Sequence, residues 1–136
     1  QALNKEEAIE EANYVLTLVK PYNITYPIAI DVEAIENDSF RQENLSASEL
    51  TDVIIAFCDT IKAAGYTPLI YSNLLYFMDN VELERLEGYD KWFAGYQTAS
   101  PYYPYRYAMW QYTSTGSING VSGNVDINIA MKNLKK

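Results

Sequence analysis

Segments with helical periodicity alternate with short apolar segments along most of the chain, and this order restricts the fold more than any other feature. We expect helices at residues 5–20, 46–64 and 73–79, with a helical turn at 82–87. We expect strands at residues 26–33, 66–72, 91–97, 107–113 and 124–130. Since such alternation is typical of parallel β/α units, the sequence predicts an α/β protein whose sheet is parallel up to residue 97.

The helix boundaries have recognisable signals. Asn4, with Glu7 three residues later, forms a capping-box-like start, and Pro21 ends that helix. The stretch Ser46 to Glu49 repeats the capping pattern, and Gly65 is a stop signal for the second helix. The last three strands are too close in sequence for helical crossovers, so we predict a short meander at the C-terminal end. No linker or repeat divides the chain, which predicts a single domain over residues 1–136.

The composition excludes several classes of chemistry. With no histidine, the chain cannot form a Ser-His-Asp or Cys-His system, and proton transfer must use carboxylates, tyrosine or lysine. The one cysteine, Cys58, lies in an apolar helical run and is expected to be a buried hydrophobe. A net charge of −8 without a basic run makes nucleic acid and anionic membranes poor partners. No apolar stretch approaches the ~18 residues of a membrane span.

The stretch "IAIDVEA", residues 28–34, ends an apolar strand with two carboxylates. Side chains alternate along a strand, so Asp31 and Glu33 share a face, with Cα atoms about 6.6 Å apart. Repulsion between two such carboxylates raises one pKa, which suits a general acid. Both the retaining and the inverting carboxyl spacing of glycosidases lie within reach of this pair. A purely structural role, with Asp31 in a cap or salt bridge and Glu33 solvated, also stays open.

Later strands add a third carboxylate and several aromatic rings. Asp126 lies between Val125 and Ile127 and is expected to point away from both. Four aromatic residues, suited either to stacking on sugars or to a core, lie near strand ends: Trp92, Tyr96, Trp110 and Tyr112. The stretch "SPYYPY", residues 100–105, is expected to be an exposed aromatic loop.

Taken together, these motifs resemble glycoside hydrolase family 25, the Chalaropsis-type lysozymes that cleave peptidoglycan. The resemblance rests on "YPIAIDVEA" (26–34), "AGYTPLIYSN" (64–73), "KWFAGYQ" (91–97) and "MWQYTSTGSINGVSGNVDIN" (109–128). The last motif, in which a Gly-containing turn leads to Val-Asp-Ile-Asn, is the most specific.

The resemblance implies a role for each matching residue. Glu33 would be the general acid, Asp31 would tune it and stabilise charge, and Asp126 would complete the acidic cluster. The positions that would line a sugar groove are Tyr71, Trp92, Tyr96, Trp110 and Gln111. The bond cleaved would be the β-1,4 link between N-acetylmuramic acid and N-acetylglucosamine, with no cofactor and no metal.

The resemblance also implies a flattened TIM-like (β/α) barrel, of which this chain would hold the C-terminal two-thirds. Barrels of this general kind need roughly 200 residues or more. We therefore expect a partial barrel, completed either by a missing N-terminal segment or by a second copy in a homo-oligomer. The expected partner is the peptidoglycan glycan strand, and the expected location is secreted or cell wall-associated, as for a phage or bacterial lysin.

Two other functions stay open at this stage. The truncated fold could bind glycan without cleaving it, as a non-catalytic fragment or pseudoenzyme. Alternatively, Asp31, Glu33 and Asp126 could supply hard oxygen ligands to a divalent cation in a protein unrelated to glycans.

Overall fold

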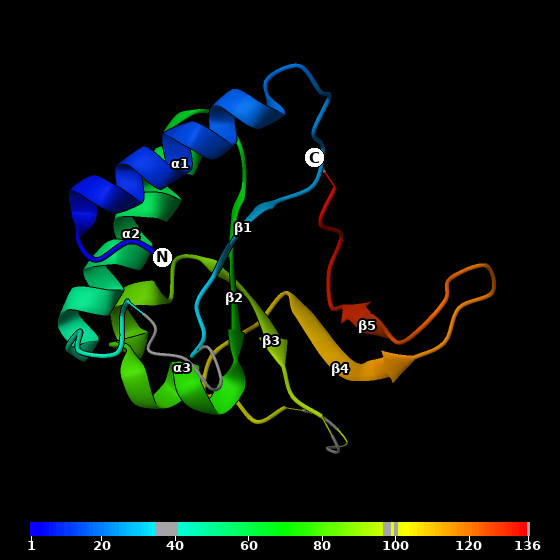
Figure 1. The fold of residues 1–136 in the computed structure, drawn as a ribbon. Helices are drawn as coiled ribbons and strands as arrows, with labels where there is room; N and C mark the ends of the chain where they lie inside the picture. The colour runs from blue at the N-terminus through cyan, green and yellow to red at the C-terminus, as the bar shows by residue number, and fades with distance from the viewer. Residues whose placement is uncertain (35–40, 97–98, 100, 136) are drawn as a thin grey trace.

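A five-stranded sheet with the order β1-β2-β3-β4-β5 forms the centre of the molecule (Figure 1). The computed structural model describes residues 1–34, 41–96, 99 and 101–135. The helices are α1 (Lys5–Val19), α2 (Ala47–Ala63), α3 (Leu74–Asn80) and the 3-10 helix η1 (Leu83–Leu86). The strands are β1 (Ile28–Asp31), β2 (Pro68–Asn73), β3 (Asp90–Ala94), β4 (Met109–Gly116) and β5 (Val125–Ala130).

The strand directions confirm the predicted order of parallel strands followed by an antiparallel end. Strands β1 to β4 are parallel neighbours, and β5 pairs antiparallel with β4. The antiparallel part is shorter than a three-strand meander, because β3 and β4 are parallel. Residues 95–108 connect the carboxyl end of β3 to the amino end of β4, which is a crossover along the length of the sheet. The described part of this connection contains no helix. Within the described residues the sheet is not closed.

Aromatic packing takes the place of a crossover helix between β3 and β4. Tyr103 is buried, with its ring centroid 4.7 Å from that of Phe93 and 6.4 Å from that of Phe77. The expectation of an exposed loop at 100–105 is therefore wrong for Tyr103, whereas Tyr102 is 79% exposed. Residue 100 lies outside the described residues. The apolar ring of Tyr103 gains more from this core contact than from water.

Caps of the predicted kind fix both long helices. The Asn4 side chain accepts a hydrogen bond from the Glu7 amide at the start of α1, and Ser46 and Glu49 form a full capping box at the start of α2. Gly65, with a φ of 89°, follows α2 in the left-handed region that glycine tolerates best. No helix in the described ranges is long and apolar enough to cross a membrane.

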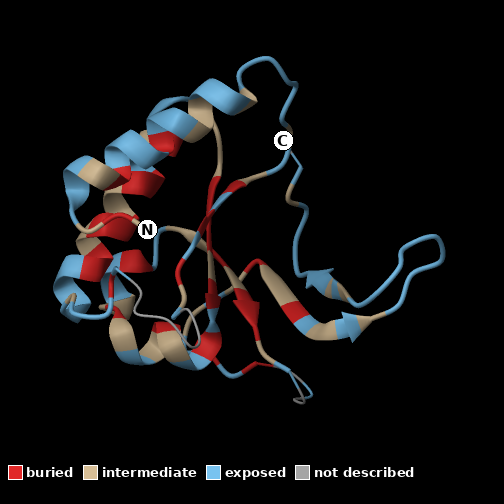
Figure 2. Cartoon of the chain, viewed as in Figure 1, coloured by how far each residue is buried: buried red, intermediate tan, exposed pale blue. Residues whose placement is uncertain are grey.

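The hydrophobic core lies between the helices and one face of the sheet, as the red segments of Figure 2 show. Helix α1 packs on α2, and α2 packs on β1 and β2. The core includes Ile28, Ile30, Val32, Ile54, Phe57, Ile61, Ile70, Phe77 and Phe93. Cys58 is fully buried among them, as predicted, and burial raises the pKa of its thiol to about 12.

The opposite face of the sheet carries a different set of side chains. In β1 the buried positions alternate with exposed ones, so that Ala29 and Asp31 lie on the face without helices. Strand pairing places Tyr71 beside Asp31, and Trp92 beside Tyr71. This helix-free face therefore receives the polar and aromatic residues that the motifs singled out.

Lys91 is a charged residue inside the core. Its side chain is fully buried, and its Nζ donates a hydrogen bond to the Leu86 carbonyl. Loss of hydration lowers the pKa of Lys91 to about 8, against the opposing effect of Asp90, Glu87 and Cys58. The folded protein therefore gives up the Lys91 proton more readily than the unfolded chain does.

We predict that Lys91→Met makes the protein about 1–2 kcal/mol more stable at pH 7, because a buried charge is replaced by an apolar chain of similar length. The destabilisation caused by the charged Lys91 declines as the pH rises above about 8, because the folded protein then loses this proton before the unfolded chain does. The advantage of the variant should therefore shrink between pH 8 and 10. Urea unfolding at several pH values measures this difference, and the exposed Lys62→Met is the matched control. A difference in the free energy of unfolding that does not change with pH would contradict the prediction.

Candidate active site

The carboxyl end of β1 brings the two predicted carboxylates to the helix-free face. Asp31 is the last residue of β1 and lies in register with Tyr71. The Val32 amide still donates to the Tyr71 carbonyl at 2.9 Å, so Glu33 follows directly beyond the strand rather than inside it. The Glu33 carbonyl accepts a hydrogen bond of 3.1 Å from the side chain of Gln1. These contacts hold the segment that carries both acids.

A buried amide fixes two tyrosines next to this segment. The side-chain oxygen of Gln111 accepts hydrogen bonds from the hydroxyls of Tyr71, at 3.1 Å, and Tyr96, at 2.6 Å. Gln111 itself is 3% exposed. The Trp92 ring meets Tyr71 edge-on, with centroids 4.8 Å apart. Since a buried amide oxygen is costly to leave unpaired, both hydroxyls are held in place.

The Tyr71 hydroxyl lies within the field of all three predicted carboxylates. Burial raises the pKa of Tyr71 far above its usual range, and the charges of Glu33, Asp31 and Asp126 add to this effect, as does Tyr96. A negative phenolate is disfavoured where other negative charges are near. Asp126 comes from β5, far along the sequence from the first two, so the fold brings three carboxylates from distant segments within electrostatic range of one phenol.

The pairing of β4 with β5 positions Asp126. Gly116 pairs with Val125, and a methyl group on Gly116 would lie 2.3 Å from Cδ1 of Ile127. Only a residue without a side chain allows β4 and β5 to approach so closely here. The position of the strand carrying Asp126 thus depends on a glycine.

Asn128 is a site residue that the sequence-based prediction missed. Its Oδ1 accepts a hydrogen bond of 2.7 Å from the Trp92 indole, and it pairs with Gln111 in register. Alternation along β5 could have identified it, because Asn128 is two residues beyond Asp126 and shares its face. It lies within the Val-Asp-Ile-Asn motif itself.

Both acids of β1 are harder to ionise than ordinary carboxyls. Reduced hydration raises the pKa of Glu33, and the Asp31 charge raises it further. Neighbouring atoms likewise remove part of the hydration of the Asp31 carboxyl and raise its pKa. A raised pKa keeps more of Glu33 protonated toward neutral pH, as a general acid requires.

Trp110 lies apart from the Tyr71 cluster. It neighbours Gln111 in β4, so its side chain takes the opposite face, in register with Phe93. The indole N–H donates to the Gly95 carbonyl at 2.8 Å. Of the eight predicted site residues, Trp110 is thus the one that contacts the cluster only through the backbone next to Tyr96.

The carboxylates that act on Tyr71 do not form a metal site in the part of the chain that the structure describes. In the described residues, no group of three or more His, Cys, Asp or Glu side chains is arranged to hold a metal ion.

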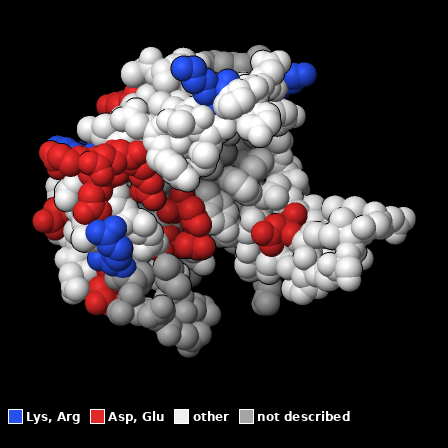
Figure 3. All heavy atoms as spheres, turned by 45° about the horizontal axis from the view of Figure 1, so that its top comes forward, with Lys and Arg blue, Asp and Glu red and all other residues white. Residues whose placement is uncertain are grey.

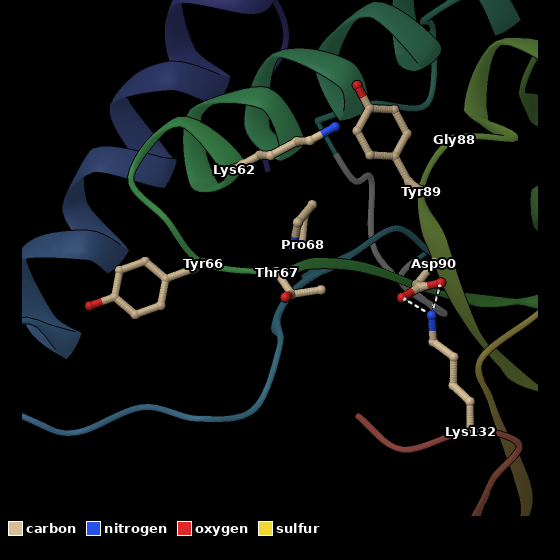
Figure 4. A pocket seen from close by; sticks show the side chains of 8 residues that line it. All are labelled: Lys62, Tyr66, Thr67, Pro68, Gly88, Tyr89, Asp90 and Lys132. Atoms are coloured by element: carbon tan, nitrogen blue, oxygen red, sulfur yellow. Dashed lines mark hydrogen bonds and ion pairs between the residues drawn. The ribbon is translucent and has the colours of Figure 1, made fainter. Parts of the chain in front are cut away.

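A separate concavity lies near the amino ends of β2 and β3 (Figure 4). It has a volume of about 350 Å³, and Lys132 bridges both oxygens of Asp90 across it, each at 2.7 Å. Its lining consists of Lys62, Tyr66, Thr67, Pro68, Gly88, Tyr89, Asp90 and Lys132. In β/α folds the amino ends of the strands generally serve stability, whereas the chemistry lies at the carboxyl ends.

The chain is thus a β/α protein with an acidic and aromatic cluster at the carboxyl ends of its parallel strands. A family model described as glycosyl hydrolases family 25 matches residues 1–121. The chain belongs to this family.

Relatives of the chain include wall-lytic proteins. It is 24% identical over 125 residues to the autolytic lysozyme of Clostridium acetobutylicum, covering 92% of this chain and 36% of that protein. It is 32% identical over 121 residues to the lysozyme of Streptococcus phage Cp-7, covering 82% of this chain and 33% of that protein. The chain thus spans about a third of the length of these curated relatives.

Among solved structures, the modular autolysin LytC from Streptococcus pneumoniae in complex with a synthetic peptidoglycan ligand superposes with a TM-score of 0.73. The two are 28% identical, and the match covers 93% of this chain and 31% of LytC. The likeness confirms the predicted fold class, a part of a TIM-like β/α fold with an open sheet.

We predict that Asp31→Asn lowers the pKa of Glu33 toward its usual range without restoring it fully. The substitution removes the Asp31 charge, whereas the reduced hydration of Glu33, which is the larger cause, remains. Carboxyl-carbon NMR titration of both proteins measures the change.

Asp79→Asn, on the exposed side of α3, is the matched control and should leave the Glu33 titration unchanged. An unaltered Glu33 pKa in Asp31→Asn would show that the two carboxyls do not interact.

Proposed function

We propose that this domain hydrolyses peptidoglycan at the β-1,4 bond between N-acetylmuramic acid and N-acetylglucosamine. The observation that carries the proposal is that Asp31 lies in register with Tyr71 and that the charges of Glu33, Asp31 and Asp126 all act on the Tyr71 hydroxyl. Family membership and the likeness to autolysins and phage lysozymes support the substrate class. The ligand-bound LytC structure supports recognition of the glycan strand.

Glu33 is the proposed general acid. Its raised pKa favours the protonated carboxyl, which donates its proton to the leaving glycosidic oxygen as the bond breaks. Its place just beyond β1 puts the carboxyl at the rim of the sheet, where a polymeric substrate has access.

Asp31 and Asp126 are proposed to stabilise the reaction's positive charge. Glycosidic cleavage passes through an oxocarbenium-like transition state, and fixed carboxylates nearby lower its energy. Asp31 also raises the pKa of Glu33, so it supports the acid as well as the cation.

The aromatic and amide side chains of the helix-free face are proposed to bind the glycan. Trp92 offers a half-buried ring beside Tyr71, and Tyr96 is 44% exposed at the end of β3. Aromatic faces stack well on the C–H surfaces of sugars. Gln111 positions Tyr71 and Tyr96 by hydrogen bonds to both hydroxyls. Trp110 is proposed to contact the glycan beside Gly95, whose carbonyl accepts the hydrogen bond of the indole.

Long-range attraction contributes little to substrate capture. Acidic side chains cover a broad area of the surface in Figure 3, and α1 alone carries Glu6, Glu7, Glu10 and Glu11. The net charge is −8, so an anionic cell wall does not attract the domain from a distance. Binding affinity must therefore come from short-range contacts on the helix-free face.

We further propose that the domain acts at the cell wall as part of a larger assembly. The outer edge of β1 is the natural place for additional strands, because β1 lies at the end of the sheet. Either an N-terminal segment or a second copy of the chain would complete the barrel there. The mass of residues 1–136 in solution, measured by light scattering, distinguishes a dimer from a monomer.

We predict that Glu33→Gln lowers the rate of peptidoglycan hydrolysis by at least about 100-fold, the usual contribution of a general acid. The substitution keeps the size of the side chain but removes the transferable proton. Release of new reducing ends from purified peptidoglycan gives the rate. Borohydride reduction and mass spectrometry should identify muramic acid at those ends.

Glu84→Gln, on the exposed surface of η1, makes the same chemical change away from the cluster and should retain full activity. Reducing ends made of glucosamine would refute the proposed bond. Glycan binding without hydrolysis by the unsubstituted chain would favour the non-catalytic alternative, to which the aromatic face is equally suited.

A further inference from the structure

A second cavity adjoins the acidic cluster at the carboxyl ends of β2 and β3. It has a volume of about 550 Å³ and lies between α3 and the segment that follows β3. Its apolar lining comes mainly from Leu74, Leu75, Met78, Pro101 and Tyr102. Leu75 is 72% exposed and Tyr102 is 79% exposed, so the apolar lining extends to the mouth of the cavity.

The polar side chains of this cavity are already engaged. The Asn73 oxygen accepts hydrogen bonds from the Leu75 and Tyr76 amides at the start of α3. The Tyr96 hydroxyl donates to Gln111. None of the described residues that line the cavity carries a charge. Such a wall suits a neutral group rich in methyls better than a sugar with many hydroxyls.

Strand register and Tyr96 link the cavity to the acidic cluster. Asn73 and Ala94 follow Tyr71 and Trp92 by two residues on the same face of their strands, which is about 6.6 Å along each strand. Tyr96 belongs to both places, since it lines the cavity and shares the Gln111 oxygen with Tyr71. A substrate held at the cluster can therefore reach the cavity with a short side branch.

We propose that this cavity binds the first part of the peptide stem of peptidoglycan, the lactyl group of muramic acid and the alanine attached to it. This inference rests on the proposed function. The lactyl–alanyl unit is neutral, carries two methyl groups and spans about two extended residues, or roughly 7 Å. Its length is close to the distance of about 6.6 Å along β2 from Tyr71 to Asn73, which lines the cavity. Its methyl groups would pack against Leu75 and Tyr102.

The proposal makes the cavity a specificity element for glycan that carries peptide. The later stem residues bear carboxylates, which the uncharged lining cannot pair, so only the beginning of the stem enters. Stem-free glycan would contact the cluster and the aromatic face but leave the cavity empty.

The test compares the binding of N-acetylmuramic acid with that of N-acetylmuramyl-L-alanyl-D-isoglutamine, followed by NMR or tryptophan fluorescence. Burying one methyl group is worth about a fourfold gain in affinity, so the peptide-bearing ligand should bind about fourfold tighter or better. Leu75→Ala combined with Tyr102→Ala should remove this preference and should weaken N-acetylmuramic acid binding less, because that ligand brings only the lactyl group to the cavity. Both residues are largely exposed, so the folded state should tolerate the change.

Leu18→Ala combined with Tyr22→Ala is the matched control, because these residues are also exposed but lie on or just after α1. This control should keep the full preference. Equal binding of both ligands by the unsubstituted protein would overturn the inference, as would an equal loss for both ligands in the cavity variant.

Hydrolysis of glycan chains stripped of their stems separates this inference from the proposed function. A protein that cleaves such chains but shows no stem preference refutes the cavity's role and leaves the function standing. A protein that prefers the stem-bearing ligand yet cleaves no glycan refutes the function instead.

Discussion

The two faces of the sheet have different environments, and the rest of the structure depends on this difference. Helices α2 and α3 bury one face, with α1 packed on α2, and Ile30, Ile70 and Phe93 build the core there. The other face has no helix over it in the described residues, so residues at alternate positions there need not be apolar. A carboxylate such as Asp31 can therefore end a strand without losing all of its hydration.

The site uses this uncovered face through a single buried amide. Gln111 holds the hydroxyls of Tyr71 and Tyr96, and the charges of all three carboxylates act on the Tyr71 phenol. The same contact joins the acidic cluster to the apolar cavity beside α3, because Tyr96 lines that cavity. The hydrogen bonds of Tyr71 and Tyr96 to Gln111 would thus support the acid chemistry and the aromatic contacts. They would also support the proposed selection of the peptide stem.

Local patterns in the sequence were sufficient to predict the helices, their caps, the parallel strands and the two acids of β1. Alternation also predicted the direction of Asp126, but only the long-range pairing of β4 with β5 brings its charge within range of Tyr71. The parallel pairing of β3 with β4 was missed, because aromatic packing by Tyr103 replaces the helix that a crossover usually contains. The motif alone grouped Trp110 with Gln111 as a residue of the sugar groove. In the structure, alternation along β4 and the hydrogen bond to the Gly95 carbonyl direct the Trp110 side chain away from the cluster.

The electrostatic influence of three carboxylates on Tyr71 is the central claim, and NMR of the tyrosine ζ-carbon tests it most directly. With the Tyr71 resonance assigned by its loss in Tyr71→Phe, its chemical shift is followed as the carboxylates ionise at acidic to neutral pH. The structure predicts that Asp31→Asn, Glu33→Gln and Asp126→Asn each remove part of the titration of this resonance. A Tyr71 resonance that ignores Asp126→Asn would contradict the account, because β5 would then not bring its carboxylate to the site.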